Sequence, residues 1–395
     1  MLPMPTNDFT SKLIGLEDAI IENIECSNDK TVIHFSLMRK TVTCPFCSSP
    51  TNKIHDYRVS YIKDIPILGN HTTLAYRKRR YHCDCCNKHF YEPFSLVPKH
   101  CRTTTRLAWY CINFLADKIS VQSVAKHNGV SPSFIFRRMK DISFSKPNRL
   151  PQVLSMDEFR GNAGGQKYQG ILTDPVKHKV FDILPSRSQA SLITYFKTFS
   201  NRKDVKYFIM DMNQSYRELA ETFFPNAKIV IDRFHYVRYV TWALENVRKR
   251  IQKSMHPSKR KYFKRSRRIL LSHYNKLNEE SKQALEIMLT QSNELAVAYH
   301  LKEKFYEFLA SKDRDEAVKR LKFFILAAQA SDLKEFKPVL TMLGNWSKYI
   351  LNSFDCPYTN GFTEGINNSI KVIKRTAYGY RNFVSFRNRI MLALS

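Results

Sequence analysis

The fold of this chain is set by the stretch VKYFIMDMNQSYRELAETFFPNAKIVID at residues 205–232. Two apolar runs, Val205–Met210 and Lys228–Ile231, each end at an aspartate, and a helical pattern lies between them. Short apolar runs bounded by turn residues are typical of buried strands. The stretch therefore predicts a strand–helix–strand unit of an α/β sheet.

Further elements extend this unit in both directions. Three short runs upstream predict strands, at Val153–Asp157, Tyr168–Leu172 and Val180–Leu184. A helix is expected to start at Ser188, and residues 234–349 are almost entirely helical in pattern. Three consecutive strands followed by an alternation of helices and strands predict an α/β sheet of mixed direction.

The N-terminal part of the chain has a different residue pattern. Residues 31–35 alternate like a strand, residues 41–100 combine most of the cysteines with short strands, and residues 103–142 are helical in pattern. A basic, proline-flanked stretch at 146–151 predicts a linker. The expected domains are residues 1–100, 101–150 and 151–395.

The composition points to a polyanionic partner. The chain has 395 residues, with 64 Lys and Arg against 35 Asp and Glu, a formal charge of +29. Hydrophobic residues make up 43%, which excludes a disordered tail protein. The longest apolar runs, such as residues 323–328, are too short to span a bilayer, and no secretory signal is visible. Nucleic acid is the expected partner, and the expected location is the cytoplasm, at the nucleoid.

A pair of CxxC knuckles predicts a structural zinc site. Cys44 and Cys47 form the first pair, and Cys83 and Cys86 form the second, about 35 residues later. Four thiolates supply the tetrahedral set that zinc needs and leave no open catalytic position. Cys85, His82 and His89 keep the ligand set open, and core cysteines without a metal are the alternative.

Residues 119–131 have the pattern of a helix-turn-helix. Val121, Val124 and Ala125 form a short apolar face, Gly129 suits the turn, and Ser131 caps a second helix, Pro132 to Lys140. That second helix carries groups suited to base edges and phosphates: Ser133, Arg137, Arg138 and Lys140. An ordinary helical hairpin in a basic protein is the alternative.

Isolated carboxylates follow the predicted strands. Asp157 ends the first strand and Asp211 the fourth, and Glu364 lies near the start of a later helix. Three such carboxylates can hold two Mg²⁺ ions for phosphoryl displacement. Each residue alone also suits a turn or a helix cap. Asp232 competes with Asp211, and spacing does not choose between them.

Together these motifs resemble the DDE class of bacterial insertion-sequence transposases, in the ISL3 group. The resemblance covers residues 44–395 and is carried by CPFC, YHCDCC, SVQSVAKHNGVS, MDEF, MDMNQSY, IDRFHYVR and NGFTEGINNSIKVIKRTAYGYRNFVSFRNRI. It implies an N-terminal zinc finger, a helix-turn-helix and a ribonuclease H-like catalytic domain with a helical insertion at about 234–350. It also implies that Asp157, Asp211 and Glu364 are the catalytic acids, with Asp232 and His235 beside the site.

The basic residues then acquire an expected partner in DNA phosphate. Eleven cations crowd the insertion: Arg248, Lys249, Arg250, Lys253, Lys259, Arg260, Lys261, Lys264, Arg265, Arg267 and Arg268. A second group follows Glu364: Lys371, Lys374, Arg375, Arg381, Arg387 and Arg389, with Tyr378 and Tyr380 among them. Trp242 and Trp346 suit core packing better than base stacking.

The resulting expectation is a transposase that binds the terminal inverted repeats of its element, cleaves DNA and transfers the strand. It would use two Mg²⁺ or Mn²⁺ ions and a structural zinc, and it would act as a homodimer or larger assembly on double-stranded DNA. One alternative is a DNA-binding regulator with an inactive catalytic domain. The other is a general nuclease of the same fold.

Overall fold

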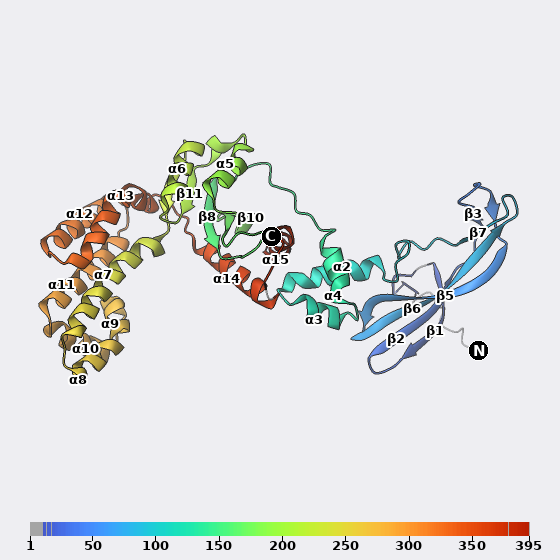
Figure 1. Ribbon diagram of the computed structural model, residues 1–395, viewed down its shortest axis with the longest axis horizontal. Coiled ribbons are helices and arrows are strands. Elements are labelled where there is room, and N and C mark those ends of the chain that lie inside the picture. Colours follow the sequence, from blue (N-terminus) through green and yellow to red (C-terminus); the bar gives the residue numbers. More distant parts are fainter. Residues whose placement is uncertain (1–10, 13, 17, 378, 395) are drawn as a thin grey trace. The chain divides into compact units, whose positions relative to one another are not determined.

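The computed structural model describes residues 11–12, 14–16, 18–377 and 379–394 (Figure 1). The chain divides into two compact units. The first unit contains the described residues up to Phe144 together with residues 372–377 and 384–393. The second unit contains residues 145–371, residues 379–383 and, among the last two residues, the described Leu394.

The first unit is built on a sheet in the order β1-β2-β6-β5, with β7 paired to β6. Its strands are β1 (Ala19–Cys26), β2 (Lys30–Leu37), β5 (Ile54–Ile67), β6 (Asn70–Cys83) and β7 (Lys88–Tyr91). A small ribbon pairs β3 (Val42–Thr43) with β4 (Pro50–Thr51). The turn between β5 and β6 has Leu68 and Gly69 at positive φ, the conformation that tight two-residue hairpins require.

Short helices follow the sheet: α2 (Thr105–Phe114), α3 (Val121–His127) and α4 (Pro132–Met139). Ser120 and Ser131 cap α3 and α4, because each side chain accepts a hydrogen bond from the backbone N–H three residues later. Gly129 has a φ of 62° in the turn between them, and a Cβ there would meet the His71 ring at 3.1 Å. Two short capped helices joined by a turn therefore occupy residues 121–139, and the second ends at Met139, one residue before the predicted end.

The C-terminal helix α15 (Phe383–Leu394) supplies part of this first unit. Arg389 is 1% exposed, and its guanidinium donates to the carbonyls of Leu115 and Ile119. Asn388 donates to the carbonyl of Ile142 at 2.7 Å. The last helix therefore shares one core with the helical segment of residues 107–142.

The second unit contains the mixed sheet that the sequence predicts. Its strands are β8 (Val153–Phe159), β9 (Gln169–Asp174), β10 (Lys179–Leu184), β11 (Tyr207–Met210) and β12 (Lys228–Ile231), in the order β10-β9-β8-β11-β12. β9 runs antiparallel to β8 and β10, whereas β8, β11 and β12 run parallel. Helices α5 (Gln189–Lys197) and α6 (Gln214–Phe223) lie between these strands in the chain.

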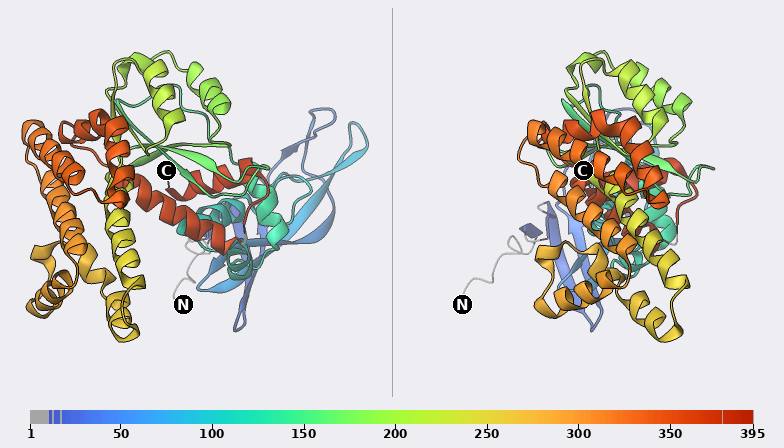
Figure 2. Two further views of the ribbon diagram at one scale, coloured as in Figure 1. Left: turned by 60° about the vertical axis from the view of Figure 1, so that its left-hand side comes forward. Right: turned by 90° about the vertical axis from the view of Figure 1, so that its left-hand side faces the viewer.

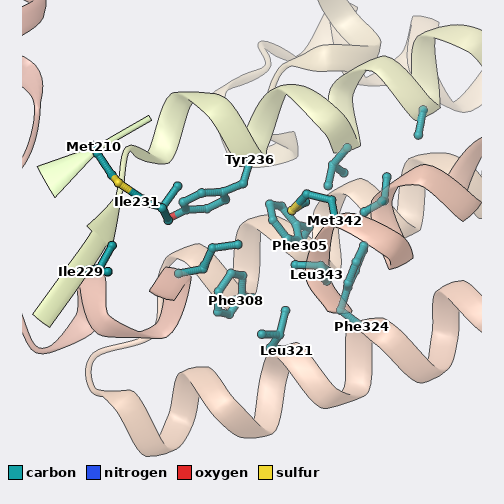
Figure 3. Close-up of a cluster of buried hydrophobic side chains, with 14 of the residues drawn as sticks. Met210, Ile229, Ile231, Tyr236, Phe305, Phe308, Leu321, Phe324, Met342 and Leu343 are labelled. Atoms are coloured by element: carbon teal, nitrogen blue, oxygen red, sulfur yellow. The ribbon is translucent and has the colours of Figure 1, made fainter. Parts of the chain in front are cut away.

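The region predicted to be helical forms a bundle that α7 joins to the sheet (Figure 2). Its helices are α7 (Arg233–Lys253), α8 (Pro257–Arg265), α9 (Arg267–Leu271), α10 (Glu279–Thr290), α11 (Asn293–Leu309), α12 (Arg314–Ala330) and α13 (Lys337–Leu351). The hydrophobic core continues from the sheet into this bundle. In Figure 3, Tyr236 of α7 lies between Ile231 of β12 and Phe305 of α11, and its ring is 6.3 Å from that of Phe305. The first turns of α7 are therefore held firmly beside the sheet.

Candidate functional site

An acidic site lies at one edge of the sheet in the second unit. Asp157 is near the end of β8, Asp211 directly follows β11, and Asp232 directly follows β12. Because these strands are parallel, their carboxyl ends meet at the same edge. Asp211, Asp232 and His235 bring a ligand atom each within 4.8 Å of one another. Asp157, Asp211, Asp232 and His235 are together called the acidic site below.

Negative charge accumulates in the acidic site. Burial, reinforced by the charge of Asp211, raises the pKa of Asp157 to about 7. Burial also raises the pKa of Asp232. The hydrogen bond to Asp211 raises the pKa of His235, whose Nε2 lies 3.0 Å from Asp211 Oδ1. A protonated His235 offsets part of this charge, and a bound cation would offset more.

Helix α14 (Gly361–Thr376) packs on the sheet through polar side chains. Thr363 is buried and lies 2.8 Å from the Thr173 hydroxyl and 3.1 Å from that of Ser155. The Ser155 hydroxyl donates to Asn360 Oδ1 at 2.5 Å, and Asn360 Nδ2 donates to Asp232 Oδ2 at 3.4 Å. Asn367 Nδ2 donates to Asp157 Oδ2 at 2.7 Å. These bonds orient two carboxylates of the acidic site.

The sequence interpretation missed Asn360 and Asn367. A usable signal was present, because Asn360, Thr363 and Asn367 recur at the three- and four-residue spacing of one helix face. Polar residues at such positions, beside buried Ile366 and Ile370, indicate a helix that packs on polar partners.

Two further glutamates, Glu364 and Glu158, lie near the acidic site but are not part of it. Glu364 is exposed on α14, three residues before Asn367 and thus on the same side of the helix. Glu158 lies next to Asp157 in β8 but points to the opposite face, because side chains alternate along a strand. It pairs with Arg187 at 2.5 Å and accepts a hydrogen bond from Tyr216 at 3.0 Å.

The acidic site suits a hard divalent cation. Asp157, Asp211 and Asp232 offer carboxylate oxygens, which Mg²⁺ prefers, and His235 adds one imidazole nitrogen beside them. Asn367 Oδ1 is also buried, and it has no hydrogen-bond partner among the described residues. An oxygen of this kind, next to Asp157, is a further potential acceptor for a metal-bound water.

A cysteine cluster forms the candidate metal site of the first unit. Cys44, Cys47, Cys83 and Cys86 bring their sulfur atoms within 4.8 Å of one another. The measured separations are 3.6 Å for Cys44–Cys86 and 3.5 Å for Cys47–Cys83. Four sulfurs at 2.3 Å from a tetrahedral zinc ion are about 3.8 Å apart, so the cluster fits structural zinc. Cys85 is exposed and lies outside it.

The predicted recognition residues are divided between two sides of α4. Ser133, Arg137 and Lys140 are exposed, whereas Arg138 pairs with Asp141 at 3.1 Å. Phe136 is 52% exposed beside them, a residue that the sequence interpretation did not single out.

The cations that follow Glu364 also differ from one another. Lys371 and Arg375 are exposed on α14, and Lys374 is half-buried. The expectation that Arg389 faces DNA is wrong, because its guanidinium is buried against backbone carbonyls of the first unit. Arg387 donates to the Phe144 carbonyl at 2.9 Å. Tyr378 lies outside the described residues.

Short internal ion pairs hold Arg248 and Arg250 of the insertion, and the exposed Lys249 and Arg267 lie further from Glu245, at 3.9 and 3.8 Å. Arg248 is buried and bonds to both oxygens of Glu245, at 2.9 and 2.7 Å. Arg250 bonds to Glu335 at 2.6 Å and to Glu294 at 2.9 Å. The prediction that these two arginines contact DNA phosphate is therefore wrong. For Arg250 the sequence could not indicate this, because Glu294 and Glu335 are remote in the chain. For Arg248 a local signal was present, because Glu245 lies three residues before it on the same helix.

Most of the other insertion cations are exposed. These are Lys249, Lys253, Lys259, Arg260, Lys261, Lys264, Arg267 and Arg268. The side chain of Arg265 lies outside the described part. Trp346 packs against the core as expected, but Trp242 is exposed, and the expectation of core packing is wrong for it.

Comparison with known proteins identifies relatives of this chain. A family model for ISL3-type transposases, described as "Transposase", matches residues 154–390. A second model, "zinc-finger of transposase IS204/IS1001/IS1096/IS1165", matches residues 40–86 and so includes the cysteine cluster. Within the described residues, no helix has the length and apolar character needed to span a membrane.

Two individual proteins are similar in sequence. The "Transposase for insertion sequence element IS1001" of Bordetella parapertussis is 26% identical over 389 residues, which cover 94% of each chain. A protein of Lactococcus lactis subsp. lactis named "ATP-dependent protease" is 36% identical over 106 residues. That second match covers 27% of this chain and 32% of the relative, so it describes one segment only.

Proposed function

Because the chain belongs to the ISL3 family of transposases, we propose that it transposes an insertion sequence by metal-dependent cleavage and strand transfer. It binds the terminal inverted repeats of its own element and hydrolyses a phosphodiester to free a 3′-hydroxyl. That hydroxyl then attacks target DNA. The full-length similarity to a transposase from Bordetella parapertussis supports this proposal.

The observation that carries the proposal is the meeting of Asp157, Asp211 and Asp232 at one sheet edge. Among the described residues, the groups that act most strongly on Asp157 include no Lys or Arg. Carboxylates gathered in this way repel one another unless a cation binds. The strand order β10-β9-β8-β11-β12, with α14 on the sheet, supports a ribonuclease H-like assignment.

We assign Asp157, Asp211 and Glu364 as the ligands of two Mg²⁺ or Mn²⁺ ions. Glu364 is the third member because Asn367, one turn further along α14, already reaches Asp157. A bound ion pair would activate a water or a 3′-hydroxyl and stabilise the leaving oxygen. Asn367 orients Asp157, and His235 orients Asp211, so the carboxylates are held before DNA arrives. No covalent protein–DNA intermediate is required.

DNA recognition is assigned to the first unit. We propose that α3 and α4 act as a helix-turn-helix, with Ser133, Arg137 and Lys140 facing the major groove. The zinc-finger segment contributes to end binding, and Lys371, Lys374 and Arg375 on α14 contact the backbone near the cleaved bond. The protein acts on paired ends as a homodimer or larger assembly, located at the nucleoid.

Strand cleavage tests the proposal. The substrate is a labelled duplex carrying the DNA that flanks this gene, incubated with Mg²⁺ or Mn²⁺. We expect cleavage at the element end, which Asp157→Ala abolishes. Glu158→Gln is the matched control, because its carboxylate faces away from the site, and it should retain activity. Tight binding without cleavage under either metal would replace the transposase with a DNA-binding regulator. Cleavage of any duplex would indicate a general nuclease.

A further inference from the structure

One side of α7 exposes aromatic side chains to solvent. Phe234 is 62% exposed, Tyr239 36% and Trp242 48%. Phe234, Arg238 and Trp242 are four residues apart, so they form a row along the helix. The Arg238 guanidinium carbon lies 5.9 Å from the centre of the Phe234 ring and 4.2 Å from that of Trp242. Phe234, Arg238, Tyr239 and Trp242 are called the aromatic row.

The aromatic row begins at the acidic site. Asp232 caps α7, and His235 in its first turn contacts Asp211. The Phe234 ring lies 5.9 Å from the His235 ring. With a rise of 1.5 Å per residue, the row from Phe234 to Trp242 extends about 12 Å along the helix. That length matches about three stacked nucleotides at 3.4 Å each.

Packing in the hydrophobic core does not explain why these aromatic residues are present on α7. The opposite side of α7 already provides the buried contacts, through Tyr236, Val240, Leu244 and Val247. Large apolar rings that face water in one contiguous row indicate a binding surface.

The charges around the row select an anionic partner. Glu245 is the single acid in the α7 sequence, and it is buried against Arg248. The exposed side continues past the row with Lys249 and Lys253 toward the cations of α8. A second copy of this face would be repelled. A partner with flat ring faces and a phosphate backbone complements both features.

We propose that the aromatic row binds unpaired nucleotides of the DNA strand next to the cleaved phosphodiester. This inference rests on the proposed function. Exposed bases stack on Phe234, Tyr239 and Trp242, while Arg238 contributes cation–π contacts and pairs with phosphate. Because neighbouring base pairs stack on one another inside a duplex and cover the ring faces, the row favours a DNA end that has opened at the acidic site.

Two measurements on the full-length protein test this inference. The first is the affinity for a labelled 20-nucleotide oligo-dT strand and for a 20-base-pair duplex. We expect Trp242→Ala to weaken strand binding roughly 5- to 100-fold, the usual cost of one lost base stack. Duplex affinity should change by less than about twofold, since phosphate contacts dominate it. Trp242→Phe should restore most of the strand affinity.

The second measurement places 2-aminopurine in an unpaired overhang of the element-end duplex. Stacking should quench its fluorescence in the wild type and in Phe323→Ala but not in Trp242→Ala. Phe323 is a matched control, because it is 59% exposed on α12 with Lys304 over its ring at 4.4 Å.

The outcomes separate this inference from the proposed function. Equal strand affinity and equal quenching in Trp242→Ala, with cleavage intact, would overturn the aromatic row alone. A change in self-association instead of DNA binding would assign the row to a protein interface and also overturn the inference. A wild-type protein that neither binds nor cleaves the element end would overturn the proposed function itself.

Discussion

The cysteine cluster and the acidic site differ in how their ligands surround an ion: the cluster is closed and the acidic site is open. In the cluster, Cys44 lies 3.6 Å from Cys86 and Cys47 lies 3.5 Å from Cys83, so four sulfurs enclose one position. The acidic site gathers carboxylates at the carboxyl ends of strands, with His235 as its counter-charge and one side toward solvent. The cluster fits an ion that holds the fold, whereas the acidic site fits an ion that must also meet substrate.

The difference lies in how the ligands are brought together. Each CxxC pair is local in the chain, and a single hairpin, β5 with β6, joins the two pairs. The carboxylates come from separate strands. Asp157 accepts a hydrogen bond from Asn367 of α14, and Asp232 accepts one from Asn360, the residue just before that helix. A closed site therefore contributes mainly to stability, and an open site contributes mainly to reactivity.

Loss of one cysteine ligand should have the largest effect. In Cys83→Ser, a structural zinc worth about 10 kcal/mol of folding free energy would be lost, because the three remaining thiolates of the cluster no longer complete the tetrahedral ligand set. We expect the zinc content to fall from one ion per chain to almost none, and amide exchange to accelerate across residues 42–91. Zinc analysis and hydrogen exchange measure both changes. Cys85→Ser, outside the cluster, is the control and should keep its zinc. A Cys83→Ser protein that retains zinc would contradict the closed-site assignment.

The next largest expected effect is a loss of folding stability as the pH rises, in protein whose acidic site holds no metal. The pKa of Asp157 is raised to about 7 by burial, above its ordinary value of 3.8. Its contribution to stability is therefore complete below pH 3.8 and is lost as the pH rises to about 7. The expected loss is at most a few kcal/mol, since one pKa unit corresponds to about 1.4 kcal/mol.

Urea unfolding of the metal-free protein from pH 4 to pH 8 measures that loss. Asp157→Asn cannot ionise, so its stability should decline less than that of the wild type over this range. Identical pH profiles for the two proteins would show that Asp157 is not held protonated by the fold.

A smaller effect is expected for Asn367→Ala. The substitution removes the hydrogen bond to Asp157 and leaves the carboxylate less well oriented. Loss of a group that orients a metal ligand typically costs about 10- to 100-fold in metal affinity or activity. Mg²⁺ titration of the cleavage rate measures this cost. Asn368→Ala is the neighbouring control, since its side chain contacts Lys371 instead. Equal Mg²⁺ dependence in both variants would remove Asn367 from the site.

Brief EDTA treatment should produce the smallest structural change. Cleavage is expected to stop because an open site exchanges its ions rapidly. The circular dichroism spectrum and the zinc content should stay close to those of the untreated protein, because the cysteine cluster is closed. Added Mg²⁺ should restore cleavage. Simultaneous loss of zinc and cleavage would mean that the cysteine cluster and the acidic site do not differ in how readily they release their ions.

The amino-acid sequence by itself determined the strands, the helical region and the cysteine cluster. Apolar runs ending at Asp157, Asp211 and Asp232 predict strand ends, and parallel pairing brings such ends to one edge. Two CxxC pairs predict a zinc site because each knuckle is a local structure. These patterns depend only on residues that are neighbours in the chain, so they can be recognised without the tertiary structure.

The tertiary structure alone decided which charged and aromatic groups remain available. Arg250 pairs with Glu294 and Glu335. Arg389 is buried against the carbonyl of Ile119, and Trp242 faces solvent instead of the core. Each outcome depends on residues far away in the chain, brought close by packing. The free energy of burying a guanidinium or exposing an indole is set by those distant partners, so no local pattern can predict it.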